Sequence, residues 1–324
     1  MKKGKKVLTS LCFILVALVV FWIVVGQIEP YQVTDYNPWR SERTLISAHR
    51  GGANLNPENT KMAFDYVINE TDYTDVVELD VRLTRDDELV IIHDASINRT
   101  GIAAEIEWEE ILIRNSSYDE LYEYNLGINF RIDEDRPYGN TNELDWDTRN
   151  DLRIMRLSDF FLEYEGDRDI KLLLEIKDSK EDGVLAADIA EAMLNDFEWW
   201  NERTMIISFS TEVVNHIIEN YPERYVAGMG YNMVPFLIGS VLGLDSLFKI
   251  KYQSVQTSMI TKAGPIEINC ATQQFVNSAH RRNQCVAYWT INDIPYMRHL
   301  IGLGADIITT NSPDVLFRVI SGVM

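Results

Sequence analysis

Short apolar runs alternate with stretches of helical spacing over most of this chain. Helical patterns lie at Thr60–Asn69, Gly183–Phe197, Thr211–Asn220 and Asp293–Ile301. Strands that alternate with helices predict βαβ units around a parallel sheet. Nine runs have the length and residue types of β-strands: Thr44–Ala48, Val76–Thr84, Glu88–His93, Ile170–Lys177, Thr204–Phe209, Arg224–Met229, Gln253–Ser258, Cys285–Ile291 and Ala305–Thr309.

The number of strands favours one α/β architecture. Glu88–His93 reads as the hairpin partner of the strand before it, which leaves eight strands for the main sheet. Eight alternating units in about 280 residues have the size of a TIM (β/α)8 barrel. A doubly wound open sheet is the alternative, and counting strands does not exclude it.

One segment breaks the alternation. Residues 97–153 are polar, charged and aromatic without a clear β/α rhythm. They follow the second strand at its carboxyl end, where the loops of a barrel build the active site. We therefore expect an insertion that acts as a lid or a specificity element.

The N-terminus predicts a membrane anchor. Residues 7–25 form an uncharged apolar run of about 19 residues, long enough to span a bilayer as a helix. Four lysines precede it, so residues 1–6 are predicted to be a cytoplasmic tail, 7–26 the anchor, 27–43 a linker and 44–324 an extracytoplasmic domain on a single-pass cell-membrane protein. A cleaved signal peptide is the alternative, although the run is long and ends without small residues of the A-x-A type.

Charge narrows the classes of partner. The chain has 30 basic and 50 acidic residues and a formal net charge of −20. Such a surface repels phosphate backbones, so nucleic acid is an unlikely partner. An anionic substrate would need local cations, either basic side chains or a metal ion. Nothing in the composition indicates the oligomeric state.

Two of the predicted strands carry charged residues. Glu78 and Asp80 alternate with apolar residues and share one strand face, and Glu175 and Lys177 do the same. Internal salt bridges that include Arg82 are one interpretation. The other is a metal site, because three carboxylates make an all-oxygen ligand set suited to Ca²⁺ or Mg²⁺, whereas zinc prefers His and Cys.

Two of the five histidines lie at predicted strand ends. His49 follows the first apolar run and His93 follows Leu89–Ile92. A single histidine in such a place is more often structural, but a pair beside acidic strands can act as general acid and base. The other three histidines lie in helical stretches. After His49, Arg50 adds a cation followed by two flexible glycines.

Two further segments allow more than one interpretation. Residues 232–248 contain one charge, Asp245, and predict either a membrane-contacting loop or an amphipathic helix packed outside the fifth and sixth strands. Cys270 and Cys285 flank a predicted helix of about 12 residues, which holds them too far apart for a disulfide.

Together the motifs resemble those of the glycerophosphodiester phosphodiesterases. The likeness covers residues 45–317 and follows the family's order of segments: HRGG, PENT, ELDVRLTRDDELVIIHD, LLLEIK, ISFS, AYWTIND and GADIITTNSP. The resemblance implies a TIM barrel with an insertion after the second strand. It also implies hydrolysis of small glycerophosphodiesters or lipid-derived substrates to glycerol 3-phosphate and an alcohol.

The resemblance also implies roles for individual residues. His49 and His93 correspond to the acid/base pair. We take His49 as the first base and His93 as the acid, with the exchanged roles as the alternative. The metal ligands of one divalent cation would be Glu78, Asp80 and Glu175, the phosphate contacts Arg50 and Lys177, and the pocket wall Trp289, with Glu58 in support. Asn311 stands where many relatives have Asp, which we expect to be a structural difference.

Two rival functions accompany this interpretation. The first is a lysophospholipase D or sphingomyelinase D-like phosphodiesterase that acts on lipids with a similar pair of histidines. The second is a membrane protein that binds polyol phosphates without turnover. The segment from Glu175 to Lys177 fits the glycerophosphodiesterases better.

Overall fold

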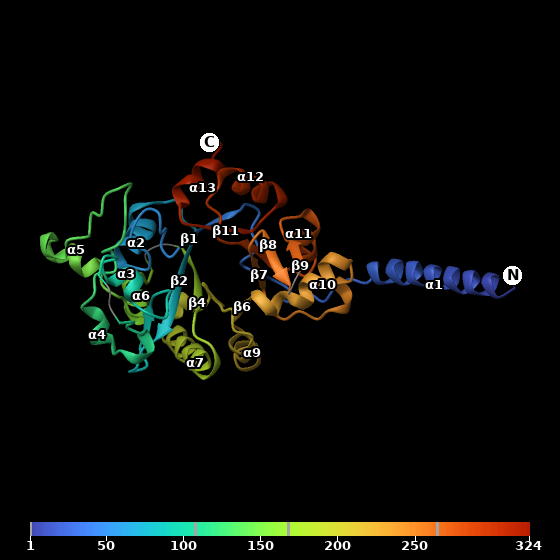
Figure 1. Ribbon diagram of the computed structural model, residues 1–324, viewed down its shortest axis with the longest axis horizontal. Helices are drawn as coiled ribbons and strands as arrows, with labels where there is room; N and C mark the ends of the chain where they lie inside the picture. Colours follow the sequence, from blue (N-terminus) through green and yellow to red (C-terminus); the bar gives the residue numbers. More distant parts are fainter. Residues whose placement is uncertain (1, 107–108, 167–168, 264–265) are drawn as a thin grey trace.

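A computed structural model of the chain contains the predicted barrel (Figure 1). It describes residues 2–106, 109–166, 169–263 and 266–324, apart from the side chains of residues 2–9, 263 and 266. Strand β1 pairs with both β2 and β11, which closes the sheet and excludes the doubly wound alternative. The eight parallel strands are β1 (Leu45–His49), β2 (Val76–Leu83), β4 (Lys171–Ile176), β5 (Thr204–Ile207), β6 (Tyr225–Gly228), β7 (Ser254–Thr257), β10 (Cys285–Tyr288) and β11 (Ile307–Thr310).

Two hairpins stand beside these parallel strands. Strand β3 (Leu89–Ile91) pairs antiparallel with the end of β2, as the sequence predicts. A second hairpin, β8 (Ile260–Ala263) and β9 (Ile266–Asn269), is not predicted by our sequence analysis. Cys270 and Cys285 are both buried free cysteines.

Helices pack against the outer face of the barrel. The four predicted helical segments appear as α2 with η1, α7, α9 and α12, each within a few residues of its predicted range. These and the other outer helices are α2 (Lys61–Asp65), the π-helical η1 (Tyr66–Glu70), α6 (Leu157–Glu163), α7 (Lys180–Asp196), α8 (Glu198–Asn201), α9 (Thr211–Asn220), α10 (Val234–Leu242), α11 (Gln273–His280), α12 (Ile294–Leu303) and α13 (Pro313–Ile320).

Strand alternation divides the core into two layers. On β2, Val77 and Leu79 face the helices, while Val76 joins a separate cluster inside the barrel. Trp39, from the irregular residues 27–43, is fully buried in that inner cluster, and the Lys171 ammonium lies 5.2 Å from its ring. The amino end of the barrel is thus filled with apolar side chains, which leaves the carboxyl end for polar ones.

The insertion has a small core of its own. It contains α3 (Asn98–Gly101), the 3-10 turn η2 (Ile113–Asn115), α4 (Tyr118–Tyr122), the 3-10 turn η3 (Thr141–Glu143) and α5 (Trp146–Asp151). The insertion and the β3 region share a buried apolar cluster made of Val90, Ile92, Ile97, Ile113, Leu121, Leu126 and Ile154. In Figure 1 the insertion and helix α1 lie at opposite ends of the molecule.

The N-terminal residues form helix α1 (Lys2–Gly26), which projects from the barrel. Among the residues whose side chains are described, no helix combines the length and the hydropathy of a bilayer span. The anchor predicted over residues 7–26 therefore stays a prediction. Helix α1 contacts the barrel domain where the Ser246 hydroxyl donates to the Val25 carbonyl at 3.1 Å.

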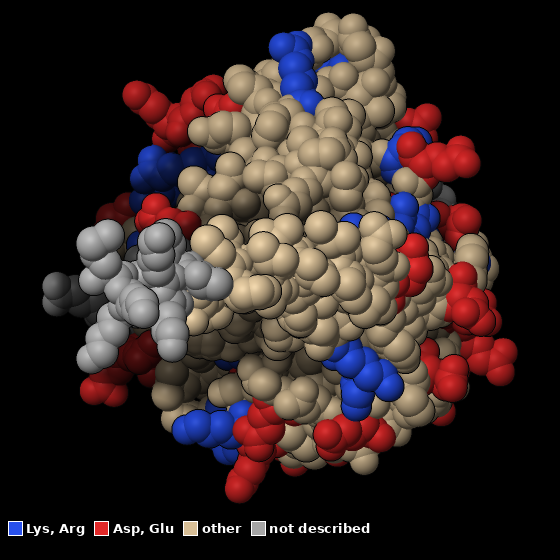
Figure 2. All heavy atoms as spheres, turned by 90° about the vertical axis from the view of Figure 1, so that its right-hand side faces the viewer, with Lys and Arg blue, Asp and Glu red and all other residues tan. Residues whose placement is uncertain are grey.

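Residues 232–248 contain α10 between two 3-10 turns, η4 (Gly230–Met233) and η5 (Asp245–Leu247). Phe236 and Leu237 are buried against the barrel, as expected of a helix that packs outside β6 and β7. Ile238, Val241 and Leu242 are exposed on its other side. Figure 2 shows the end of the molecule that carries α1 and α10: its middle is largely uncharged and the charged side chains lie around the rim.

Candidate active site

The three predicted carboxylates meet inside the carboxyl end of the barrel. Asp80 on β2 is the register partner of Glu175 on β4, and Glu78 lies two residues before Asp80 on the same strand face. One oxygen of each carboxylate lies within 4.8 Å of the others, and all three residues are buried. Strand alternation thus places these acidic side chains above the apolar inner layer.

Crowding of buried negative charge changes the pKa values of these groups. Burial, together with the charge of Asp80, raises the pKa of Glu78 to about 8 and that of Glu175 to about 7. Burial also acts to raise the pKa of Asp80, but Lys177 and Arg50 outweigh it and hold that pKa below its usual value. A cation bound among the three oxygens would relieve this repulsion.

Lys177 and Arg50 are the basic side chains in contact with this cluster among the described residues. The Lys177 ammonium donates to Glu175 Oε1 at 2.7 Å and lies 3.5 Å from Asp80 Oδ1. Arg50 Nε lies 3.2 Å from Asp80 Oδ2. Arg82 is not part of the cluster, because it binds Asp178 at 2.9 Å and the His93 carbonyl. The interpretation as salt bridges that include Arg82 is therefore wrong for that residue.

The turn after β1 brings backbone as well as side chains to the site. Arg50 and the two glycines after it all have positive φ angles, and a Cβ on Gly51 would lie 2.8 Å from the Ala63 Cβ. This tight turn directs the Arg50 N–H to Glu78 Oε2 at 2.8 Å. Glycine at position 51 is thus required for the close approach of the turn to α2.

His49 is the last residue of β1, and each nitrogen of its ring faces a polar side chain. Its Nδ1 lies 2.5 Å from Asn311 Oδ1, and its Nε2 lies 4.0 Å from Glu78 Oε2. An amide oxygen only accepts hydrogen bonds, so Nδ1 carries the proton and Nε2 presents its lone pair to the site. Burial, with a contribution from Arg50, lowers the pKa of His49 and favours the neutral ring.

His93 follows β3 on the other side of Asp80. Its Nδ1 lies 2.6 Å from Asp94 Oδ1, which leaves Nε2 free to exchange a proton. Burial lowers the pKa of His93, although the charge of Asp80 and the bond to Asp94 act in the opposite direction. The charge of Asp80 also acts on His49, so both histidines lie within its electrostatic reach.

Glu58 links the site to the insertion. It accepts from Arg50 Nη1 at 2.8 Å and binds Arg99 of α3 through both of its oxygens, at 2.7 and 2.9 Å. Arg99 also donates to Asp94, which holds His93. Burial acts to raise the pKa of Glu58, but these arginines keep it below its usual value. Arg99 of the insertion therefore binds both Glu58, which contacts Arg50, and Asp94, which contacts His93.

Trp289 lines a small cavity of about 20 Å³ together with His49, Glu78 and Glu175. Its ring packs edge to face on Phe209, with the ring centroids 5.5 Å apart. Trp289 thus forms an apolar wall beside the carboxylates, where the sequence analysis places a substrate pocket.

The structure brings all nine predicted site residues into one connected region, and it adds others. Asn59 donates to Asp80 Oδ2 at 2.9 Å, and Asp94 and Arg99 hold His93 and Glu58. Asn311 contacts His49 directly, a contact that the sequence did not predict, and whether the Asn-for-Asp difference is tolerated stays a prediction. For Asn311 the signal was available in the sequence, as an atypical residue within a motif.

Comparisons with known proteins give one consistent result. The model of the glycerophosphoryl diester phosphodiesterase family matches residues 49–315. A glycerophosphodiester phosphodiesterase from Caldanaerobacter subterraneus is 28% identical over 280 residues, which are 86% of this chain and 98% of that protein.

Solved structures share the fold. An Oleispira antarctica phosphodiesterase, solved with the product sn-glycerol-3-phosphate, matches with a TM-score of 0.63 at 18% identity, covering 86% of this chain and 97% of that one. A glycerophosphodiester phosphodiesterase from Agrobacterium tumefaciens matches with a TM-score of 0.59 at 20% identity, covering 85% and 99%.

Proposed function

Since the chain belongs to the glycerophosphoryl diester phosphodiesterase family, and is therefore a phosphoric diester hydrolase, we propose that it cleaves glycerophosphodiesters to glycerol 3-phosphate and an alcohol with one divalent cation. The observation that carries this proposal is the buried triad Glu78, Asp80 and Glu175 beside His49. The named activity of its relative from Caldanaerobacter and the product held by its structural neighbour support the same reaction.

The triad fits a hard cation in number, charge and chemistry. Two basic side chains, Arg50 and Lys177, contact the three carboxylates, and Arg50 also forms an ion pair with Glu58. Asp80 Oδ1 is buried and has no hydrogen-bond donor among the described residues. All-oxygen ligands favour Ca²⁺ or Mg²⁺. When bound, such an ion would withdraw charge from a phosphodiester oxygen.

The two histidines support acid–base catalysis. In this proposal His49 Nε2 takes the proton of the nucleophile, either the 2-hydroxyl of the glycerol group or a water molecule. The oxygen of the nucleophile then bonds to phosphorus as the bond between phosphorus and the leaving oxygen breaks, and protonated His93 gives its Nε2 proton to that oxygen. Attack by water yields glycerol 3-phosphate directly, whereas attack by the 2-hydroxyl yields a cyclic phosphodiester that a water molecule opens in a second step. Asn311 and Asp94 bind the Nδ1 atoms and so direct both Nε2 atoms to the reaction.

Arg50 and Lys177 are proposed to hold the phosphate. Both are largely buried beside Asp80, where charge-assisted hydrogen bonds are stronger than in water. Trp289 would pack against the apolar part of the substrate. Glu58 would orient Arg50 without touching the substrate.

A substrate panel tests the reaction. The full-length chain is incubated with glycerophosphocholine and, separately, with lysophosphatidylcholine, and glycerol 3-phosphate and choline are measured. We expect glycerol 3-phosphate from the first substrate, no product after EDTA, and recovery with added Ca²⁺ or Mg²⁺. Turnover of lysophosphatidylcholine alone would instead favour the lipid-directed rival, and full activity in EDTA would refute the metal-dependent scheme.

Matched variants test the site. Removal of an acid–base group costs about 10²–10⁴-fold in rate, so His49→Ala is expected to lose about that much. Glu78→Gln is expected to lose metal-dependent activity, because it removes one of the three carboxylates that would hold the cation. His299→Ala is the control, because His299 lies on α12 and contacts the Ala271 carbonyl instead of the site. Wild-type rates in His49→Ala would contradict the assignment.

We also propose that residues 7–26 attach the enzyme to a membrane with the catalytic domain outside the cytoplasm. The apolar run and the lysines before it support this proposal. So do the exposed apolar side chains of α1 from Leu11 to Val24 and those of α10 at the same end of the molecule. Cell fractionation and digestion of intact cells by added protease test it. Recovery in the soluble fraction, or full protection from the protease, would contradict it.

A further inference from the structure

A second group of positively charged side chains lies in the insertion, outside the catalytic cluster. A cavity of about 780 Å³ has nine described residues in its lining, three of them arginines and none of these nine acidic: Asn98, Arg99, Ile102, Ala103, Ala104, Ile106, Asn129, Arg131 and Arg136. This lining is unusual for a chain in which 50 acidic residues outnumber 30 basic ones. In such a protein, a cavity whose described lining holds three arginines and no carboxylate is a candidate site for an anion.

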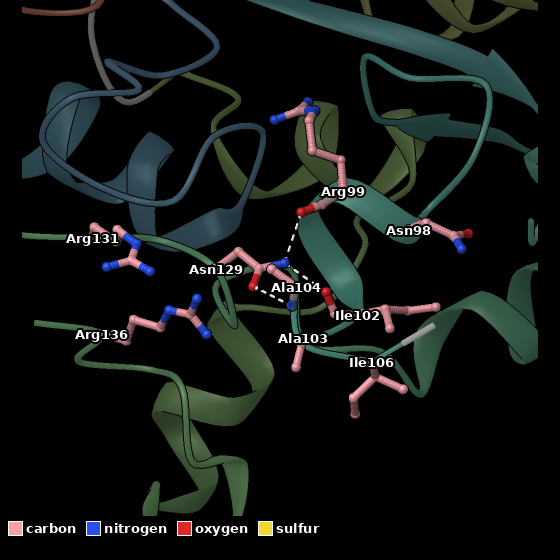
Figure 3. Close-up of a pocket in the computed structure, with 9 residues that line it drawn as sticks. All are labelled: Asn98, Arg99, Ile102, Ala103, Ala104, Ile106, Asn129, Arg131 and Arg136. Atoms are coloured by element: carbon pink, nitrogen blue, oxygen red, sulfur yellow. Dashed lines mark hydrogen bonds between the residues drawn. The ribbon is translucent and has the colours of Figure 1, made fainter. Parts of the chain in front are cut away.

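Local structure holds two of these arginines together. The backbones of Ile132 and Asp135 form an antiparallel bridge, with N–H to carbonyl distances of 3.0 and 3.1 Å. Arg131 and Arg136 therefore flank a tight turn and lie side by side on one wall of the cavity (Figure 3). Two guanidinium groups on one wall together attract an anion that lies between them.

The two arginines differ in their partners. Arg136 binds Glu105 with both ends of its guanidinium, at 2.6 and 2.9 Å. Arg131 has no hydrogen bond or ion pair with any residue that the structure describes, so its donors remain available. An arginine with a free guanidinium beside a second arginine can hold a phosphate by two parallel hydrogen bonds.

The opposite wall is fixed by an amide. Asn129 donates to the carbonyls of Arg99 and Ile102 and accepts from the Ala104 N–H (Figure 3). Ile102 and Ile106 add apolar surface to this wall. The cavity therefore combines a cationic wall with an apolar one, which suits a ligand made of a phosphate and a short carbon backbone.

The cavity adjoins the catalytic site. A second cavity of about 350 Å³ shares Arg99, Asn129 and Arg131 with the first, and it is also lined by Glu58, which holds Arg50. In Figure 3 the Arg99 guanidinium is turned away from Arg131 and Arg136, in keeping with its bonds to Glu58 and Asp94. The cavity of the arginine pair therefore borders a second cavity that is lined by Glu58, the partner of Arg50.

We propose that Arg131 and Arg136 form a subsite for a second phosphate, so that the preferred substrates carry two or more phosphodiester groups along a polyol chain. The proposal rests on the proposed function, because the first phosphate must occupy the catalytic site. The insertion lies at the opposite end of the molecule from α1 (Figure 1), which favours a soluble polyanion over a lipid in the membrane that α1 would enter.

A pair of matched substrates tests the subsite. One has a single phosphodiester between two glycerol groups, and the other has three glycerols joined by two phosphodiesters. The measured quantity is the ratio of kcat/KM for the longer substrate to that for the shorter one. We expect Arg131→Ala to lower this ratio about tenfold, as loss of a charge-assisted contact implies, and Arg131→Lys to retain part of it.

Arg298→Ala is the control, since Arg298 is an exposed arginine on α12 and the change in net charge is identical. The ratio should also fall with added salt in the wild type and less steeply in Arg131→Ala. A ratio in Arg131→Ala within twofold of wild type would overturn the subsite. So would a dependence on Arg131 confined to vesicles of phosphatidylglycerol. If the wild type cleaved neither soluble substrate, the proposed function itself would fail.

Discussion

The contact between His49 and Asn311 makes a prediction about the pH dependence of catalysis. Asn311 Oδ1 lies 2.5 Å from His49 Nδ1 and holds the ring in the tautomer with a free Nε2, without adding charge. Asn311→Asp keeps the shape and the acceptor but places a carboxylate against the ring. A carboxylate stabilises the imidazolium, so the substitution raises the pKa of His49.

The size of the shift follows from the geometry. An opposite charge within about 4–6 Å moves a pKa by about 1–3 units, and each unit corresponds to about 1.4 kcal/mol. Position 311 is partly exposed, and Arg50 near the ring already offsets part of the added charge. We therefore expect a rise of about 1–2 units. If neutral His49 is the base, the acid limb of activity moves to higher pH by the same amount.

The assay is the pH profile of kcat/KM for glycerophosphocholine from pH 4.5 to 9 at a fixed, saturating concentration of divalent cation. Burial lowers the pKa of His49 in the wild type, so its acid limb should lie below pH 6.5. In Asn311→Asp the limb should lie about 1–2 units higher, so that at pH values below both limbs the rate falls about 10- to 100-fold while the profile near pH 8 keeps its shape.

Asn54→Asp is the control for this experiment. It makes the same chemical change on an exposed residue whose amide binds Ser312, so solvent screens the new charge. An acid limb that moves equally in both variants would mean that general surface charge, and not the contact with His49, sets the profile. An alkaline limb that moves instead of the acid limb would make His49 the general acid and reverse the two histidine roles.

Three further predictions concern the metal and the stability of the fold. Added Ca²⁺ or Mg²⁺ should stabilise the wild type by about 2.7 kcal/mol at 100 times its Kd, measured by thermal denaturation, and Glu78→Gln should lose this effect. The same stabilisation should grow from pH 6 to 8.5, because the pKa of Glu78 is raised to about 8 and a protonated carboxyl must lose its proton before a cation binds. Trp39→Ala should lower the free energy of unfolding in urea by about 3–5 kcal/mol, since the ring is fully buried in the inner layer of the barrel. A loss below about 1 kcal/mol would show that residues 27–43 do not belong to the folded unit.

The main features of the fold follow from local sequence patterns. The eight barrel strands begin and end within a few residues of their predicted ranges, because each is a short apolar run bounded by turn residues. The hairpin of β8 and β9 was missed. Its strands are half polar and mostly lie outside the core, so they lack the apolar run that marks the barrel strands.

The candidate site was predictable only in part. Glu78, Asp80 and Glu175 stand out because a buried strand rarely carries carboxylates. The bonds of Arg99 to Glu58 and Asp94 join segments that are separate in the sequence, and no local pattern encodes such a pairing. The role of Asn311 depended on which atom of His49 it meets, which the sequence does not specify.

The links through Arg99 bear on how the insertion contributes to specificity. A lid that opens and closes would have to break the bonds of Arg99 to Glu58 and Asp94 in each cycle, and the insertion has a packed apolar core behind them. These contacts favour a fixed wall over a moving lid. A wall that is already ordered does not have to be ordered when a ligand binds, so binding loses no free energy for that purpose. The contact proposed between the two arginines and a second phosphate can therefore contribute to affinity. Selection among phosphodiesters would then rest on the spacing between this wall and the triad, and a substrate chain of the wrong length would gain nothing from Arg131.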